Sequence, residues 1–163
     1  MMISSKGRYA LRVMLDMAEY GGESFIPLSD IAHRQHISRK YLESIMTVLC
    51  KNELVESAVG KAGGYRLLRP AERYSAGEIL RAAEGSLVPV SCLSSSDCKK
   101  CGGSCTCYTL PFWQGLEEQI TAYLDRYTLR DLLRAKESAP DCVCGGHEKS
   151  NESTTSERNG SVS

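Results

Sequence analysis

Five of the eight cysteines in the chain lie within sixteen residues, and their spacing is suited to metal or redox chemistry. They are Cys92, Cys98, Cys101, Cys105 and Cys107, in the pattern C-x5-C-x2-C-x3-C-x-C. Zinc sites with four cysteines usually offer two C-x2-C pairs, and this segment has one. Iron–sulphur clusters are held by thiolates that converge from a flexible loop, and Gly102 and Gly103 supply that freedom. The spacing therefore favours an iron–sulphur centre, and a zinc site or a set of oxidisable free thiols stays open as an alternative.

The composition is that of an ordinary folded protein with a slightly basic front. The 163 residues are 42% hydrophobic and 25% charged, with 20 Lys+Arg and 20 Asp+Glu. Residues 1–74 hold 11 Lys/Arg against 8 Asp/Glu, whereas residues 75–163 hold 9 against 12, which is compatible with nucleic-acid binding. Neither a signal peptide nor a membrane span is evident, so we expect a cytoplasmic protein without a membrane partner. In that compartment thiols stay reduced and serve metal or redox chemistry.

The hydrophobic periodicity predicts a mostly α fold with a small β-hairpin. Helices are expected over residues 5–20, 27–36, 38–52, 75–84, 110–127 and 128–135, and strands over 54–59 and 65–68 flank a glycine-rich tip. The apolar stripe of the first helix is expected at Leu11, Met14, Leu15 and Ala18. We divide the chain into a winged helix-turn-helix (residues 1–85), a cysteine-rich loop (86–109), a long helix with a short terminal helix (110–137) and a disordered tail (138–163).

The helix that follows the turn has the residues of a recognition helix. Leu42, Ile45, Met46 and Leu49 form its inward stripe, and Lys40, Glu43, Ser44 and Thr47 share the opposite face. Ser38 is the predicted N-cap, Arg39 and Tyr41 lie near the N-terminus, and Lys61 stands at the tip of the wing. These side chains suit base edges and phosphates in a major groove. A solvated face on a winged helix that does not bind DNA is the plainer alternative, and the turn, the divided face and the wing together favour DNA.

Three stretches of the sequence resemble a known family. They are Ser5-Lys6-Gly7-Arg8-Tyr9-Ala10-Leu11, Ile37-Ser38-Arg39-Lys40-Tyr41-Leu42-Glu43 and Gly63-Gly64-Tyr65. Together they are similar to the Rrf-two family of bacterial winged-helix regulators, over roughly residues 1–135. The resemblance implies a homodimer paired through the long helix, a palindromic double-stranded operator, and three cysteines that hold a [2Fe–2S] or [4Fe–4S] cluster. By position the matching thiols are Cys92, Cys98 and Cys107.

The sequence departs from the family pattern at three positions. In one branch of the family a histidine follows three residues after the last cysteine, and this chain has Leu110 there. In another branch an acidic residue near the N-terminus completes the site, and this chain has Arg8. The fourth ligand is thus unassigned, with Cys101 and Cys105 as candidates. Val59 replaces the usual wing arginine, which leaves Lys61 to make that contact.

The leading hypothesis is a DNA-binding transcriptional regulator, a repressor, that senses iron–sulphur, redox or nitric-oxide status through the cysteine loop. The second is the same DNA-binding head with zinc or thiol-based sensing. The third is a small metal or electron carrier. We do not expect an enzyme, because His33, His36 and His147 show no partnership with a nucleophile or carboxylate. Cys142, Cys144 and His147 form a second possible ligand set, to which we assign no essential role.

Overall fold

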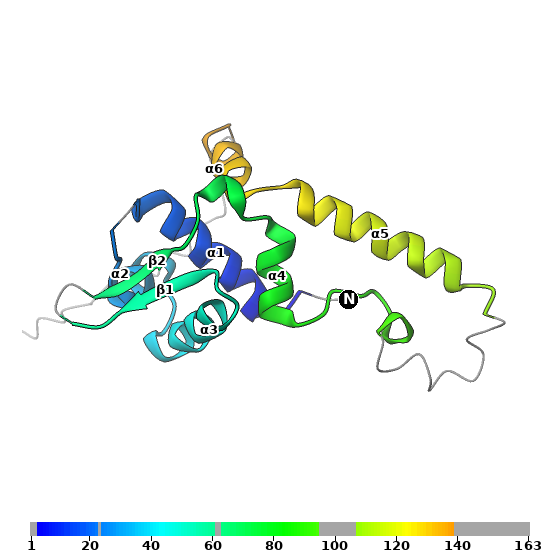
Figure 1. The fold of residues 1–163 in the computed structure, drawn as a ribbon, viewed down its shortest axis with the longest axis horizontal. Helices are drawn as coiled ribbons and strands as arrows, with labels where there is room; N and C mark the ends of the chain where they lie inside the picture. The colour runs from blue at the N-terminus through cyan, green and yellow to red at the C-terminus, as the bar shows by residue number, and fades with distance from the viewer. Residues whose placement is uncertain (1–2, 23, 61–62, 95–106, 139–163) are drawn as a thin grey trace, which may run out of the picture.

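In the computed structural model a helical head carries a two-stranded hairpin on one side and a long projecting helix on the other (Figure 1). The structure describes residues 3–22, 24–60, 63–94 and 107–138. In chain order the elements are α1 (Ser5–Tyr20), α2 (Leu28–Gln35), α3 (Arg39–Lys51), β1 (Val55–Ala58), β2 (Gly64–Leu67), η1 (Ala71–Arg73), α4 (Ala76–Glu84), η2 (Ser91–Leu93), α5 (Leu110–Arg126) and α6 (Leu129–Ser138). The predicted mostly α winged helix-turn-helix with a long C-terminal helix is confirmed. Lys61 and the tail after residue 138 lie outside the described residues.

Helix α1 is the centre of the head and packs against α2, α3, α4, α6 and β2. Ser4 caps it, since its hydroxyl accepts from the backbone N–H groups of Lys6 and Gly7. The fully buried apolar side chains are Ala10, Val13, Met14 and Met17, whereas Leu11, Leu15 and Ala18 are only partly buried. The predicted stripe was therefore displaced by about one residue. The displacement arises because α1 has neighbours on several sides, so that its apolar surface is wider than a single amphipathic stripe.

The turn between α2 and α3 is fixed by a residue in the left-handed conformation. His36 has φ +52° and ψ +44°, and its N–H donates to the carbonyl of His33 at 3.3 Å. The next N–H, of Ile37, donates to Ala32 at 3.1 Å, which completes a Schellman ending. Ile37 is buried and belongs to the core. The same pair of bonds ends α3, where Glu53 has φ +55° and Leu54 donates to Leu49 at 3.0 Å.

The hairpin is held against the head by the segment that precedes α2. Strands β1 and β2 are antiparallel, with Val55 opposite Leu67 and Ala58 opposite Gly64. Ile26 extends this ladder, because its N–H and C=O both bond to Tyr65 at 2.9 Å. A Cβ at Gly64 would collide with the backbone of Ile26, so glycine permits this close approach.

Helix α5 leaves the head and runs out beyond it, in contact with α4 but with no buried residue of its own (Figure 1). After α5 the chain returns to the head, where Ala76 N–H donates to Tyr127 O at 2.8 Å. Helix α6 begins with a reciprocal capping box, in which the Thr128 hydroxyl accepts from the N–H of Asp131 and the Asp131 carboxylate accepts from the N–H of Thr128. Leu129 is fully buried in the core of the head. Among the described residues, no helix is long and apolar enough to cross a membrane.

Candidate nucleic-acid interface and cysteine segment

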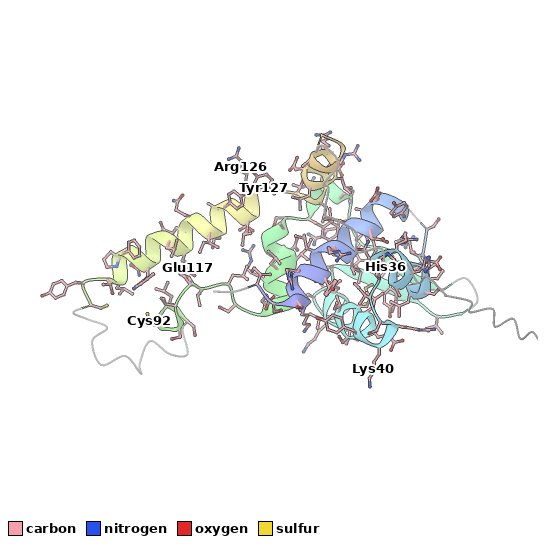
Figure 2. All side chains as sticks on the ribbon, turned by 180° about the vertical axis from the view of Figure 1, so that it is seen from behind. His36, Lys40, Cys92, Glu117, Arg126 and Tyr127 are labelled. Atoms are coloured by element: carbon pink, nitrogen blue, oxygen red, sulfur yellow. The ribbon has the colours of Figure 1, made fainter. Side chains whose placement is uncertain are left out.

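Helix α3 has one buried face and one solvent face, as its sequence predicts. Ser38 caps the helix by accepting from the N–H of Tyr41 at 3.4 Å. The predicted inward stripe of Leu42, Ile45, Met46 and Leu49 is fully buried. The predicted DNA-facing residues that are exposed are Ser38, Arg39, Lys40, Glu43, Ser44 and Thr47, and Tyr41 is half-buried. Figure 2 shows Lys40 extending from α3 away from the rest of the head. The structure therefore presents these polar side chains together on one free surface.

Several of these side chains have partners on the same helix. Arg39 Nε lies 3.3 Å from Glu43 Oε1, in an ion pair with both side chains more than half exposed. Such a pair contributes about 0.3–0.5 kcal/mol, so either residue can exchange its partner for a base or phosphate at small cost. The hydroxyls of Ser44 and Thr47 donate to the carbonyls of Tyr41 and Glu43. Their oxygens keep lone pairs that accept hydrogen bonds from donors such as the cytosine amino group.

A groove separates α3 from the hairpin. Arg39, Glu43 and Thr47 line it from α3, and Ser57–Gly60 and Gly63–Tyr65 line it from the hairpin. Val59 is fully exposed at the end of β1, at the position that replaces the family arginine. The recognition face and the described part of the wing thus form one continuous surface. Glu56 and Arg66, which are paired across the two strands, line a different hollow, next to α1.

A buried ion pair positions the turn, and sequence analysis missed it. Asp16 of α1 is 0% exposed in its side chain, and both its carboxylate oxygens accept from Arg34 at the end of α2. Gln35 Nε2 donates to the same carboxylate at 2.8 Å. The hydrogen bond to Asp16 raises the pKa of Arg34 above its ordinary value. The only signal in the sequence is an acidic residue among the apolar positions of α1, and its partner lies 18 residues away.

The structure describes two of the five clustered cysteines. Cys92 lies in η2, beyond α4 (Figure 2), and Cys107 lies three residues before α5; both are half-buried free thiols. Hydrogen bonding from the Thr109 hydroxyl, 3.3 Å away, and from the backbone lowers the pKa of Cys107, which favours the thiolate that binds metals. Cys98, Cys101 and Cys105 lie outside the described residues. Within the described ranges no three His, Cys, Asp or Glu side chains are grouped to hold a metal ion.

The two other positions that depart from the family pattern are also described. Arg8 is exposed on α1, where its guanidinium donates to the Ser5 hydroxyl at 3.1 Å. Leu110 begins α5 and is half-buried. Neither side chain has an atom that can ligate iron, so in this chain any fourth protein ligand comes from another residue.

A family model and curated relatives identify the family of this chain. Residues 3–135 match the model of the Rrf2 family, described as an iron-dependent transcriptional regulator. The chain is 39% identical to the HTH-type transcriptional regulator IscR of Xenorhabdus nematophila over 137 residues, which cover 84% of this chain and 82% of that protein. It is also 39% identical to IscR of Vibrio vulnificus, over 84% of this chain and 80% of the relative.

Solved structures of the family superpose on this chain. The structure of CymR, the global cysteine regulator of B. subtilis, matches with a TM-score of 0.66 at 32% identity, over 83% of this chain and 98% of that one. The IscR structure from T. potens matches with a TM-score of 0.66 at 34% identity, over 85% and 90% of the two chains. The relatives are transcriptional regulators and not enzymes, as expected from the sequence. The chain belongs to the Rrf2 family and is a DNA-binding transcriptional regulator with a winged helix-turn-helix.

Proposed function

We propose that the regulator places α3 in the major groove of a double-stranded operator and reads it with Lys40, Glu43, Ser44 and Thr47. The supporting observation is the shared solvent face of these residues, opposite a fully buried apolar stripe. Ser38, Arg39 and Tyr41 lie at the N-terminus of α3, where backbone N–H groups favour phosphates. Lys61, between β1 and β2 in sequence, is proposed to contact the adjacent DNA backbone from the wing.

The test is to select an operator from random-sequence duplexes with the wild-type protein and then measure binding of Lys40→Ala and Glu43→Ala. We expect each variant to lose affinity for the selected duplex and to change which bases are preferred. Loss of one good base contact corresponds to about 1–3 kcal/mol of discrimination. Glu72→Ala, in η1 away from α3, is the matched control and should bind as wild type. Unchanged base preference in both α3 variants would refute this orientation.

We further propose that α5 pairs with the same helix of a second copy. In the chain by itself α5 has no buried residue, and Phe112, Leu116 and Tyr123 are 66%, 37% and 61% exposed. Ile120 and Leu124 line an apolar hollow with Tyr123 and Ile3. Aromatic and aliphatic side chains that repeat along one projecting helix are stabilised when a partner covers them. A homodimer carries two α3 helices, which matches a palindromic operator.

The sensing site is proposed in residues 86–109, with Cys92, Cys98 and Cys107 as ligands and Cys101 or Cys105 as the fourth. The described residues fit this assignment, because Cys92 and Cys107 are free thiols and Cys107 is biased toward the thiolate. A [2Fe–2S] or [4Fe–4S] cluster bound there would supply a reversible response to iron, oxidants or nitric oxide. The protein contributes the thiolates and joins their segment to α4 on one side and α5 on the other.

Serine substitution tests the ligands one by one in anaerobically purified protein. We expect Cys92→Ser, Cys98→Ser and Cys107→Ser each to abolish the visible absorption and to lower iron and sulphide content. Cys50→Ser, in α3, is the matched control and should keep the full absorbance. Comparison of Cys101→Ser with Cys105→Ser identifies the fourth ligand, since only its loss should change the spectrum. Full absorbance in all of the first three variants would refute the ligand set.

A sensor that responds through oxidation of its thiols is the second candidate, and one solved structure supports it. CymR of Staphylococcus aureus in an oxidized form matches with a TM-score of 0.60 at 34% identity, over 81% of this chain. A sensor of this kind would use Cys107, whose hydrogen bonds favour the reactive thiolate. Metal and sulphide analysis separates the two candidates. Colourless, iron-free protein whose DNA binding changes with oxidant would favour thiols.

A further inference from the structure

The face of α3 that is proposed to enter DNA has the hairpin on one side and basic residues of α1 on the other. Arg39, Glu43 and Thr47 line the groove toward the hairpin. Tyr41 is two residues from both Arg39 and Glu43, and in an α-helix that separation is about 160° around the axis. Tyr41 therefore marks the flank of α3 that is opposite to the wing. It meets Tyr9 of α1 there, edge to face, with ring centroids 5.9 Å apart.

Two arginines accompany Tyr9 on this side of α3. Arg8 and Arg12 are four residues apart, so they lie one above the other on α1, and both are exposed. The guanidinium of Arg12 lies over the Tyr9 ring, 5.2 Å from its centroid. Arg12 Nε also donates to Gln35 Oε1 at 3.1 Å, at the end of α2. These contacts hold Arg12 beside the turn that leads into the N-terminus of α3.

The chemistry of these arginines suits phosphate. A guanidinium has five N–H donors, and the contacts of Arg12 with Gln35 occupy only part of them. Arg8 donates to the Ser5 hydroxyl, a neutral partner. The acidic groups of this region have other partners, since Glu43 pairs with Arg39 and Asp16 is buried against Arg34. Glu84, beside the start of α1, accepts from the N–H groups of Ser4 and Gly7. Among the described residues, neither Arg8 nor Arg12 forms an ion pair with a carboxylate, so both guanidinium groups are open to a phosphate.

We infer that Arg8 and Arg12 bind the phosphate backbone on the side of the major groove opposite to the wing. The inference rests on the proposed placement of α3, because a helix in the groove has one sugar–phosphate strand on each flank. The wing meets one strand, and the end of α1 meets the other. Contacts of this kind position the protein on the duplex and carry no sequence information themselves. Arg8, at the place of an acidic ligand in one branch of the family, has in this chain a role in DNA binding.

The salt dependence of DNA binding tests the inference. Wild type, Arg8→Ala, Arg12→Ala and Arg12→Lys are titrated against two fluorescent duplexes, one selected from random sequence by the wild-type protein and one scrambled. Each lost phosphate contact should reduce the slope of log Kobs against log salt by about 0.9. We expect this reduction in both alanine variants, on both duplexes, and restoration in Arg12→Lys. The ratio of affinities for the two duplexes should not change.

Arg73→Ala is the matched control, because Arg73 is an exposed arginine in η1, away from α3 (Figure 1). Its slope should equal that of wild type, and thermal unfolding of all variants checks that the head is intact. If Arg8→Ala and Arg12→Ala keep the wild-type slope while Lys40→Ala weakens binding, the inference is wrong and the placement of α3 stands. If Lys40→Ala also binds as wild type, the placement itself fails. A changed ratio between the duplexes would show base reading and would overturn the phosphate assignment.

Discussion

Replacement of Arg34 by methionine is expected to destabilise the head severely, because it leaves a buried carboxylate without its charge partner. Asp16 is 0% exposed, and Arg34 contacts it through Nε and Nη2 at 2.6–3.1 Å. Gln35 alone would remain as a donor to Asp16. The hydrogen bond to Asp16 raises the pKa of Arg34 above that of a free arginine, so the guanidinium stays charged at any pH below the pKa of a free arginine. Its stabilising effect is therefore present throughout the neutral range.

The size of the loss follows from the burial of the two partners. Breaking a buried ion pair on one side costs about 3–5 kcal/mol. Arg34 is 29% exposed, so water can reach the site once the guanidinium is removed, and the lower end of about 3 kcal/mol applies. For a protein of this size that loss lowers the Tm by about 6–12 °C. Methionine keeps most of the aliphatic volume, so the effect is one of charge rather than of packing.

Urea denaturation followed by circular dichroism measures this loss. The control is Arg39→Met, which breaks an exposed pair and should cost at most about 0.5 kcal/mol. Asp16→Leu combined with Arg34→Met removes both charges and should recover at least half of the stability, because an apolar pair of similar volume replaces a buried ion pair without large cost. A loss below about 1 kcal/mol in Arg34→Met would refute the buried-pair reasoning.

Three other changes have defined outcomes. Gly64→Ala places a Cβ against the backbone of Ile26 and should cost about 1–3 kcal/mol in urea denaturation, so an unchanged midpoint would contradict the close approach. When apo-protein is alkylated over a range of pH and analysed by mass spectrometry, Cys107 should react half-maximally at a pH below the ordinary thiol pKa, because its thiolate is stabilised. Thr109→Val should raise that pH. An equal pH in both proteins would refute the role of the hydroxyl. Leu116→Asp should convert a dimer to monomer in sedimentation while the head stays folded, and a persistent dimer would place the pairing surface elsewhere.

Local patterns were sufficient for most of the helices. The cap at Ser38 and the four buried positions of α3 follow from the preference of serine for N-caps and from the helical repeat, which depend only on neighbouring residues. The residue type did not predict the turn at His36, because histidine adopts the left-handed conformation at some cost. Glu53 also adopts the left-handed conformation, for which glutamate has no preference. The left-handed conformation of Glu53 is stabilised because the next residue, Leu54, packs in the core.

Long-range contacts explain what sequence patterns could not predict. Ser75, where the expected helix begins, caps α4, whereas the carboxylate of Glu78, three residues later, accepts from Arg69 Nη2 at 2.6 Å. Asp16 is acidic within a buried face, and only the fold brings Arg34 to it. The phosphate-binding role proposed for Arg12 likewise needed the contact between Tyr9 and Tyr41, which joins residues 32 positions apart. The identity of the fourth cluster ligand stays a prediction, because its candidates lie outside the described residues.

Two carboxylates connect the cysteine segment to the proposed DNA-binding surface. Glu84, the last residue of α4, accepts from the N–H and hydroxyl of Ser4 and from the N–H of Gly7, one residue before Arg8. Asp125, near the end of α5, accepts from Ser75 Oγ at 3.2 Å and from Arg81 of α4. The segment with the five cysteines begins just after Glu84 and ends at α5. These bonds tie the end of α4, where that segment begins, to the start of α1, and they tie the far end of α5 to α4.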